Sequence, residues 1–292
     1  MVKAKEKSLA QKQKNHFGMY AFKIVMFTFL FLWTCSMAYC LFWLVNNSLK
    51  EQLVYEIDQV HLAKKPLQWR NYINAFTELQ VKGNNMVTML WNTVWVTTGN
   101  IFLQIASSLL FSYIVARYKF PGRDLIYFLV IFRMMFTTVG TLPATYQLYD
   151  TLGITNSPAF LITNLHGTAN FLVYYATFRG ASSSYAEAAF LDGANHWQVF
   201  IKVMVPQVTG VITATVISSF IANWNEYMTF ILYLDNFPSI ASGIYFFELE
   251  NEGENYPMLL AAVTMSIIPV VVIFAAFQKY FINIDISGGL KG

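Results

Sequence analysis

The chain has 292 residues, of which 56% are hydrophobic, 17% aromatic and only 12% charged. Soluble domains carry about 25% charged residues, so this composition excludes an ordinary soluble protein and indicates a membrane protein with several spans. The net charge of +3 is small and no basic block occurs, which argues against a nucleic-acid partner. Cys35 and Cys40 lie in the first apolar run, and we interpret them as buried free thiols rather than a disulfide or metal pair.

The first 20 residues are polar and rich in lysine. We expect them to form a disordered tail in the cytoplasm, because lysine and arginine favour that side of a membrane. An apolar run over residues 21–45 follows. It is too long for the apolar core of a signal peptide and lacks a small-residue cleavage site, so we interpret it as a retained span.

Five further apolar runs predict an all-α membrane protein with six transmembrane helices. We place the spans at residues 21–45, 86–116, 125–148, 158–178, 208–234 and 257–281. The polar segment 46–85 is expected outside the cell, with a partial helix near Trp69–Leu79. The cations of the turn at 117–123 indicate the cytoplasm, and the acidic loop 235–256 indicates the outside. Both termini are therefore expected in the cytoplasm.

Residues 182–206 form a polar segment between the fourth and fifth predicted spans. Ser184 and Glu187 have the spacing of a capping box, in which the hydroxyl accepts from the Glu187 N–H and the carboxylate reaches back. Neighbouring alanines favour a helix, Gly193 supplies a stop, and Asn195 can cap a second short helix. Such a helix could lie in a groove of another protein. An ordinary amphipathic loop is the alternative.

The stretch EAAFLDGANHWQVFIKVMVP resembles the EAA loop of ABC importer permeases. The residues that match this motif in type and spacing are Glu187, Ala188, Ala189, Gly193, Ile201 and Pro206. The triplet at 192–194 resembles the sugar-importer branch. Residues 116–123 (ARYKFPGR), 222–226 (ANWNE) and 278–292 (ending GGLKG) resemble the maltose-type subfamily. The resemblance covers nearly the whole chain after the first span and implies the type I importer permease fold.

In that family the loop contains a coupling helix that docks into a cleft on a cytoplasmic ATPase. The resemblance implies these docking residues: Ser184, Glu187, Ala188, Ala189, Asp192, Gly193 and Ala194. It also implies that Glu187 pairs with a basic group of the ATPase and that the tail at 288–292 approaches the ATPase pair.

The resemblance implies an assembly as well. Two copies of the ATPase subunit would hold ATP and Mg, and a second, different permease subunit would complete the pore as a heterodimer. An extracellular or periplasmic solute-binding protein would deliver the cargo. The chain would be surrounded by membrane lipid, as a multi-pass protein of the bacterial cytoplasmic (inner) membrane.

Among the charged residues inside predicted spans, Arg133 and Glu226 lie well away from the span ends, at a depth where charge is costly and usually functional. They could pair across the bundle, or each could face a water-filled cavity. We predict that the translocation path is lined by Asn223, Trp224, Asn225, Glu226 and Tyr227. Amides and carboxylates can bind sugar hydroxyls, and an indole can cover an apolar sugar face. Contacts between helices are the alternative for Glu226, and we favour a structural role for Arg133.

The sequence contains no nucleophile–base pair, phosphate-binding glycine loop or metal cluster, so we expect no catalytic residue, metal or cofactor in this chain. The predicted organisation is a cytoplasmic tail (1–20), a permease domain (21–281) and a second cytoplasmic tail (282–292). The leading hypothesis is a permease subunit of an ATP-driven importer for an oligosaccharide. The alternatives are an ABC permease for a non-sugar solute, an ion-coupled secondary transporter using Arg133 and Glu226, and a membrane-anchored assembly protein.

Overall fold

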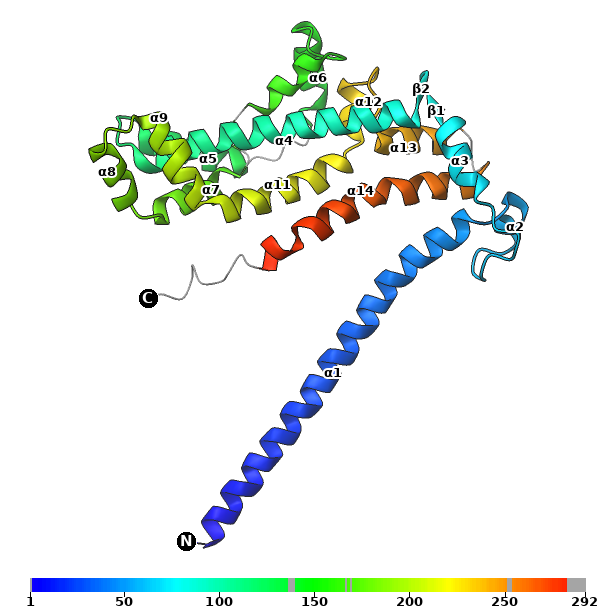
Figure 1. The fold of residues 1–292 in the computed structure, drawn as a ribbon, viewed down its shortest axis with the longest axis horizontal. Coiled ribbons are helices and arrows are strands. Elements are labelled where there is room, and N and C mark those ends of the chain that lie inside the picture. The colour runs from blue at the N-terminus through cyan, green and yellow to red at the C-terminus, as the bar shows by residue number, and fades with distance from the viewer. Residues whose placement is uncertain (1, 136–139, 166, 169, 251–253, 283–292) are drawn as a thin grey trace. The chain divides into compact units, whose positions relative to one another are not determined.

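The computed structural model describes residues 2–135, 140–165, 167–168, 170–250 and 254–282. The chain divides into two compact units, each with its own internal contacts. Unit 1 comprises Met1–Tyr72 and Glu254–Thr264, and unit 2 comprises Ile73–Gly253 and Met265–Gly292. Most of the described structure is helical, as the composition predicts (Figure 1).

Unit 1 begins with the long helix α1 (Val2–Ser48), the blue helix of Figure 1, followed by α2 (Gln52–Ile57). The expectation of a disordered tail is wrong, because α1 starts at Val2 and continues through the first predicted span. The tail is rich in Ala, Lys, Gln and Glu, which are good helix formers. Most apolar side chains from Phe22 to Val45 are exposed, as suits a helix in contact with lipid. The two cysteines are free, but they are exposed on this helix rather than buried.

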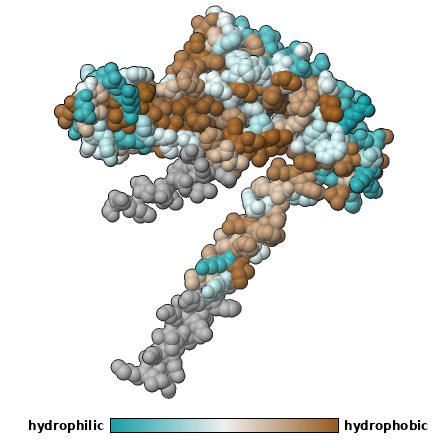
Figure 2. Space-filling model, in the orientation of Figure 1, coloured by the Kyte–Doolittle hydropathy of each residue, from teal (hydrophilic) through white to brown (hydrophobic). Residues whose placement is uncertain are grey.

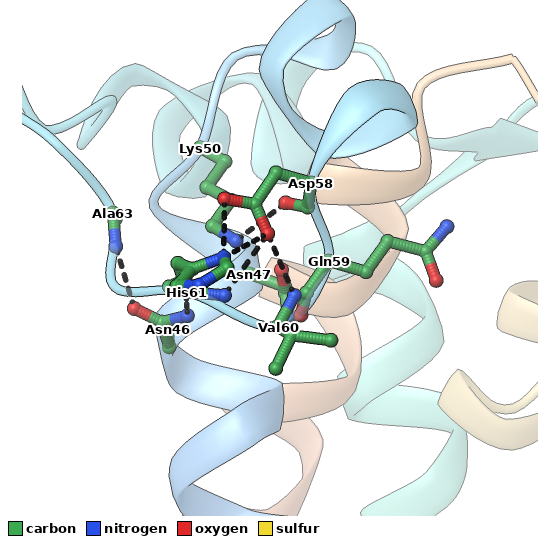
Figure 3. A network of polar contacts seen from close by, with 8 residues as sticks. All are labelled: Asn46, Asn47, Lys50, Asp58, Gln59, Val60, His61 and Ala63. Atoms are coloured by element: carbon green, nitrogen blue, oxygen red, sulfur yellow. Dashed lines mark hydrogen bonds and ion pairs between the residues drawn. The ribbon is translucent and has the colours of Figure 1, made fainter.

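The loop after α1 is held by hydrogen bonds from side chains to its own main chain (Figure 3). Asn46 donates from Nδ2 to the C=O of His61 (3.0 Å) and accepts at Oδ1 from the N–H of Ala63 (2.8 Å). Lys50 is only 3% exposed, and its Nζ donates to the C=O of Asp58 (2.7 Å). These bonds satisfy main-chain groups that no helix or strand satisfies, so the loop is ordered.

Asp58 organises the turn at the centre of this loop (Figure 3). Its Oδ1 accepts from the N–H groups of Val60 (3.1 Å) and His61 (3.0 Å), and the His61 ring lies 3.0 Å away. The hydrogen bond from the His61 backbone, followed by that from its side chain, lowers the pKa of Asp58 to about 2. The carboxylate therefore stays ionised over the physiological pH range.

Unit 2 contains most of the remaining elements. They are α3 (Arg70–Thr77, shared with unit 1), β1 (Gln80–Val81), β2 (Asn84–Asn85), α4 (Met86–Arg117), α5 (Arg123–Met135), α6 (Leu142–Thr151), the 3-10 helix η1 (Pro158–Asn164), α7 (Phe171–Gly180), α8 (Ser184–Leu191), α9 (His196–Gln198), the π-helix η2 (Val199–Met204), α10 (Val205–Gln207), α11 (Thr209–Trp224), α12 (Met228–Tyr233), α13 (Ile240–Glu250) and α14 (Tyr256–Ile282, also shared). The two short strands pair antiparallel. Helix α3 lies inside the range where a partial helix was predicted.

The core of unit 2 forms where α4, α7 and η2 meet. Its largest buried side chains are aromatic: Tyr113 on α4, Phe171, Tyr174 and Phe178 on α7, and Phe200 on η2. The rings of Tyr113 and Phe200 lie 4.8 Å apart and those of Tyr113 and Phe178 5.4 Å apart. Aromatic pairs at these distances add packing energy beyond the area that they bury. This core anchors the polar segment 182–206.

The third and fourth predicted spans are not continuous helices. Helix α5 ends at Met135 and α6 begins at Leu142, after Gly140 with a φ of +88° and before Pro143. The fourth begins as η1, and α7 follows only after Asn170, whose φ is +56°. Positive φ angles interrupt helices, so the prediction of continuous helices over 125–148 and 158–178 is wrong.

Three helical segments among the described residues are long and apolar enough to cross a membrane: Phe22–Ser48, Met86–Arg117 and Tyr256–Phe277. A fourth candidate is the pair His196–Gln207 and Thr209–Trp224, whose axes differ by 77°. Figure 2 shows a hydrophobic surface along the coloured part of α1. Hydrophilic residues gather on the end of unit 2 that carries α8 and α9.

The acidic segment 235–256 was predicted as a solvated loop, but it contains α13. Ile240 donates its N–H to the Thr93 hydroxyl on α4 (2.9 Å), and Ser242 is fully buried. A Cβ on Gly243 would lie only 2.2 Å from the Met89 sulfur, so glycine permits the close approach of α13 to α4. The segment folds in this way because about half of its residues are apolar and α13 packs on α4.

Candidate functional site

Helix α8 carries the predicted coupling residues and has two different faces. Ala186 and Ala189 are half-buried and pack against the core of unit 2. On the outer face Tyr185 is 63% exposed, Ala188 is exposed, and Leu191 is 90% exposed. These three residues are spaced by three, so they follow one stripe of the helix. One face of α8 is therefore fixed to the bundle, and the other presents apolar side chains outward.

Most of the predicted coupling residues are accessible. The exposed ones are Ser184, Glu187, Ala188, Asp192 and Gly193, and the half-buried ones are Ala189 and Ala194. Ala194 packs on the same core as Ala189. The structure thus places the seven residues on α8 and the turn that follows it, which is compatible with docking.

The C-terminus of α8 is closed by backbone hydrogen bonds alone. Gly193 has a φ of +85°, its N–H donates to the C=O of Phe190, and the N–H of Ala194 donates to the C=O of Ala189, both at 3.0 Å. This is a Schellman motif, in which a left-handed residue ends the helix and satisfies its last carbonyls. The predicted stop at Gly193 is confirmed.

The predicted capping box of Ser184 and Glu187 is wrong. Ser184 is the first residue of α8, and Ser183 precedes it as the cap without a side-chain bond. The N–H of Glu187 already donates to the C=O of Ser183 (3.0 Å), so it is not available to a serine hydroxyl. Instead, Ser182 Oγ accepts from the N–H of Ser184 (3.2 Å). The Glu187 N–H therefore bonds the Ser183 carbonyl and not the Ser184 hydroxyl.

A capping box occurs instead at α9, as the predicted cap at Asn195 suggests. The Asn195 side chain accepts from the N–H of Gln198 (2.8 Å), and the Gln198 side chain accepts from the N–H of Asn195 (2.9 Å). The π-helix η2 follows, and Pro206 lies just beyond it. Pro206 lies at the start of α10, Val205–Gln207, a position that tolerates its missing N–H. The helix path then bends by 77° before α11.

Polar contacts connect the segment 182–206 to α4. Arg117 donates to the C=O of Ala181, just before α8. The Tyr118 hydroxyl and His196 Nδ1 lie 2.8 Å apart, and the His196 ring makes an edge contact with Phe190 at 5.0 Å. A displacement of α8 would therefore strain the contacts of Arg117 and Tyr118 and move the C-terminal end of α4.

A second candidate site is a polar cavity at the middle of α4. Its volume is about 240 Å³. It is lined by Asn100, Phe160, Thr163, Asn164, Ala222, Asn223, Glu226, Thr229 and Phe230. These residues come from α4, η1, α11, the α11–α12 break and α12. An opening lined by amides, hydroxyls, a carboxylate and aromatic rings is chemically suited to a hydroxylated solute.

Three asparagines form a chain of hydrogen bonds beside this cavity. Asn164 donates to Asn100 (2.8 Å), Asn100 donates to Asn223 (3.2 Å), and Asn223 donates to the C=O of Ser219 (2.8 Å). Glu226 accepts from the N–H of Thr229 (2.9 Å). The chain orients each amide, so each remaining acceptor or donor has a defined direction.

The structure separates the five predicted path residues. Asn223 and Glu226 line the cavity. Trp224 is buried, its Nε1 donates to the C=O of Ser266 (3.0 Å), and its ring lies 5.3 Å from that of Phe220. Asn225 is exposed and donates to the C=O of Ile221 (2.8 Å). The Tyr227 ring lies 5.1 Å from that of Tyr245, in a tilted arrangement. The last three do not line this cavity.

Arg133 and Glu226 do not pair in the described structure. Arg133 donates to the Thr168 hydroxyl, a structural contact from α5 to the segment before α7. Two other cavity residues, Asn100 and Asn164, were not selected from the sequence. The sequence feature that could have identified them is an uncharged amide inside an apolar run, which indicates a functional site less strongly than an ionisable group does. The predicted tail contact at 288–292 lies outside the described residues.

In the described part of the chain, no group of three or more His, Cys, Asp or Glu residues is placed to hold a metal ion.

Comparison with known sequences identifies one family. Residues 108–283 match the family described as binding-protein-dependent transport system inner membrane component. The maltose/maltodextrin transport system permease protein MalG of Escherichia coli is 32% identical over 215 residues, covering 70% of this chain and 72% of MalG. The diacetylchitobiose uptake system permease protein NgcG of Streptomyces coelicolor is 26% identical, covering 88% of this chain and 85% of NgcG.

Comparison with solved structures shows the same fold. A chain of a bacterial ABC transporter involved in the import of the acidic polysaccharide alginate superimposes with a TM-score of 0.75 and 22% identity. The match covers 89% of this chain and 96% of that one. A second structure, of the alginate transporter in complex with an alginate pentasaccharide-bound periplasmic protein, gives a TM-score of 0.62.

Proposed function

The chain belongs to the family of inner-membrane components of binding-protein-dependent transport systems, and from this premise we propose that it is the permease subunit of an ATP-driven carbohydrate importer. The observation that carries the proposal is the two-faced helix α8. It is fixed to the core by Ala186 and Ala189, and it presents Ala188 and Leu191 outward. A surface of this kind fits a groove on a partner protein.

In the proposed mechanism, α8 is the coupling helix. ATP binding closes a dimer of cytoplasmic ATPase subunits, and the docked α8 moves with its ATPase subunit. The Schellman motif at Gly193 and the capping box at Asn195 fix the angle between α8 and α9. Contacts of Tyr118 with His196 would carry the motion to α4, whose middle bears the polar cavity. Alternating access would follow from that motion.

The full assembly is part of the proposal. The chain would contribute six membrane crossings, with the interrupted segments at 123–151 and 158–180 supplying the third and fourth, and with both termini in the cytoplasm. A different permease subunit would complete the pore, two ATPase subunits would hold ATP and Mg, and an external solute-binding protein would deliver the cargo. The alginate transporter in complex with its periplasmic protein supports the external solute-binding protein of this proposal.

The carbohydrate assignment rests on the relatives and on the cavity. Three relatives are named for the transport of saccharides: MalG, NgcG and the arabinooligosaccharides transport system permease protein AraQ of Halalkalibacterium halodurans. The cavity offers amides, a carboxylate and two phenyl rings, which are the groups that saccharides need. No observation favours an ion-coupled carrier, since Arg133 and Glu226 do not pair in the described structure.

The coupling proposal is tested by Leu191→Glu. Leu191 is 90% exposed, so the substitution should leave the fold intact while placing a charge in the docked interface. We expect co-purification of the ATPase, and ATP hydrolysis stimulated by the binding protein, to fall by about tenfold or more. Leu62→Glu, at a leucine 67% exposed in the unit 1 loop, is the matched control and should change neither. Normal coupling in Leu191→Glu would refute the proposed docking surface.

The path proposal is tested with two neighbouring asparagines. Asn223 and Asn225 each donate to the carbonyl four residues earlier, but only Asn223 lines the cavity. We expect Asn223→Ala to reduce uptake of the delivered oligosaccharide by about tenfold, because it leaves the Asn100 amide without its acceptor. Asn225→Ala should retain uptake. Equal effects of the two substitutions would place the path elsewhere.

A further inference from the structure

The turn between α4 and α5 carries cations that have no anionic partner in the described structure. Arg117, Lys119 and Arg123 lie in or beside this turn, and Arg179 lies at the end of α7. The ion pairs formed by described residues lie elsewhere in the chain. Four positive side chains thus gather at one end of unit 2, and none of them forms an ion pair with a described residue.

The guanidinium groups are held in place by neutral acceptors. Arg179 Nη1 and Arg123 Nη2 both donate to the Tyr175 hydroxyl, at 2.9 and 3.5 Å. Arg117 donates to the C=O of Ala181, and its Nε is buried without a partner among the described residues. A phenol and a carbonyl orient guanidinium groups but do not neutralise them. The remaining donors of these groups are therefore available to an anion.

A cavity of about 580 Å³ lies at the same turn. It is lined by Lys119, Phe120, Pro121, Gly122, Arg123, Asp124 and Leu125. Asp124 is the single carboxylate of the lining, and it makes no ion pair with a described residue. The two lining cations, with Arg117 and Arg179 close by, outweigh it, so the cavity has a net positive charge. Arginine and lysine are the side chains that bind phosphate groups.

An exposed apolar stripe begins where the cationic cavity ends. On α5, Leu125 is 60% exposed, Phe128 57% and Leu129 51%. Their spacing of three and four places them on one face of the helix. Cations next to an exposed apolar helix face match the two parts of a phospholipid, a charged headgroup and its acyl chains.

We propose that this turn is a binding site for an anionic phospholipid, with the phosphate at Lys119 and Arg123 and the acyl chains along Leu125, Phe128 and Leu129. The inference goes beyond the proposed transport function and does not depend on it. Carboxylates of a soluble partner could also meet the cations. They would leave the apolar face of α5 uncovered, however, so the observations favour lipid.

The test measures lipid binding to the purified full-length protein in detergent. Native mass spectrometry would count lipid adducts with palmitoyl-oleoyl phosphatidylglycerol and with palmitoyl-oleoyl phosphatidylcholine. Thermal unfolding with each lipid, and with inorganic phosphate alone, would be measured in parallel. We expect phosphatidylglycerol adducts to exceed phosphatidylcholine adducts by about tenfold in the wild-type chain and to raise its Tm. Inorganic phosphate should not raise the Tm.

The key variant is Lys119→Gln/Arg123→Gln, which should bind the two lipids equally. The matched control is Lys64→Gln/Lys202→Gln, which removes the same charge at two other exposed lysines and should keep the preference for phosphatidylglycerol. If the key variant fails to fold, Lys119→Gln alone serves, since Lys119 is exposed; it should reduce the preference by about threefold.

Three outcomes would overturn the proposal. The first is equal binding of both lipids by the wild-type chain. The second is an undiminished preference for phosphatidylglycerol in the Lys119→Gln/Arg123→Gln variant. If that variant also loses binding of a soluble partner protein, the cations would be reassigned to that protein. The third is an equal rise in Tm with inorganic phosphate, which would show a site for a free anion.

Discussion

Two polar stretches of similar length, 46–63 in unit 1 and 182–198 in unit 2, differ in how far their side chains are engaged with their own main chain. In the first, the side chains of Asn46, Lys50 and Asp58 bind the loop's own backbone (Figure 3). In the second, side chains bond the main chain at Ser182 and in the Asn195–Gln198 capping box, but the end of α8 is closed by backbone bonds at Gly193. Side chains that hold their own loop are not available to a partner. The side chains of α8 are available, and this difference distinguishes a structural loop from a docking element.

The largest expected effect is on the stability of the first stretch. Asn46→Ala removes two hydrogen bonds and leaves the C=O of His61 and the N–H of Ala63 unpaired. We expect local opening of the loop to become easier by about 2–3 kcal/mol, because lost buried hydrogen bonds are costly. Hydrogen exchange of residues 58–63 would measure it. ATPase coupling should not change, and a loss of coupling would break the contrast between the two stretches.

The control for that experiment is Asn74→Ala. Asn74 lies on α3, and its side chain makes no hydrogen bond with any described residue. Exchange in the loop should stay at the wild-type rate. Equal effects of the two alanines would mean that the bonds of Asn46 do not hold the loop.

The second effect is on the backbone closure of α8. Gly193→Val forces a branched side chain into a left-handed conformation, which costs about 1–2 kcal/mol. We expect the α8–α9 angle to relax and ATP hydrolysis coupled to uptake to fall, with little change in the expression of the protein. Gly180→Val is the control, since Gly180 has no positive φ and no neighbour within 4 Å of a new Cβ. Equal coupling in both variants would show that the Schellman motif is not needed.

The third effect tests the side-chain cap of α9. Asn195→Ala removes half of the capping box and should weaken α9 by about 1 kcal/mol. Asn195→Asp keeps an acceptor oxygen and should restore protection, because both residues are good caps. Hydrogen exchange of the Gln198 amide would report the difference. An Asn195→Asp variant as unprotected as Asn195→Ala would show that capping does not order this part of the segment.

The smallest effect is a pH dependence at Asp58. Its pKa in the folded chain is lowered to about 2, below the value of about 3.9 in an unfolded chain. The carboxylate therefore stabilises the loop above about pH 4, and this contribution is lost as the pH falls from about 4 towards 2. Proteolysis by pepsin across this range should cut the wild-type loop progressively faster. Asp58→Asn should show a weaker dependence, and an unchanged slope would assign the titration to another group.

Part of the site could be predicted because its signals are local in the sequence. The stop at Gly193 and the cap at Asn195 each depend on residues within a few positions. The capping box at Ser184 was predicted wrongly, although it is also local. Two acceptors competed for the same N–H of Glu187, and the backbone carbonyl of Ser183 formed the bond.

The sequence alone determined the membrane class, the polar segment at 182–206 and the position of its helices, because composition and caps act over short distances. Only the tertiary structure decided which polar residues meet. Asn100 and Asn223 are 123 positions apart but share a hydrogen bond, whereas Asn225 lies next to Asn223 and points elsewhere. Packing of α8 on η2 and on the core of unit 2 also decided that α8 presents Leu191 rather than Ala189. Burial depends on contacts distant in the sequence, and no local pattern specifies them.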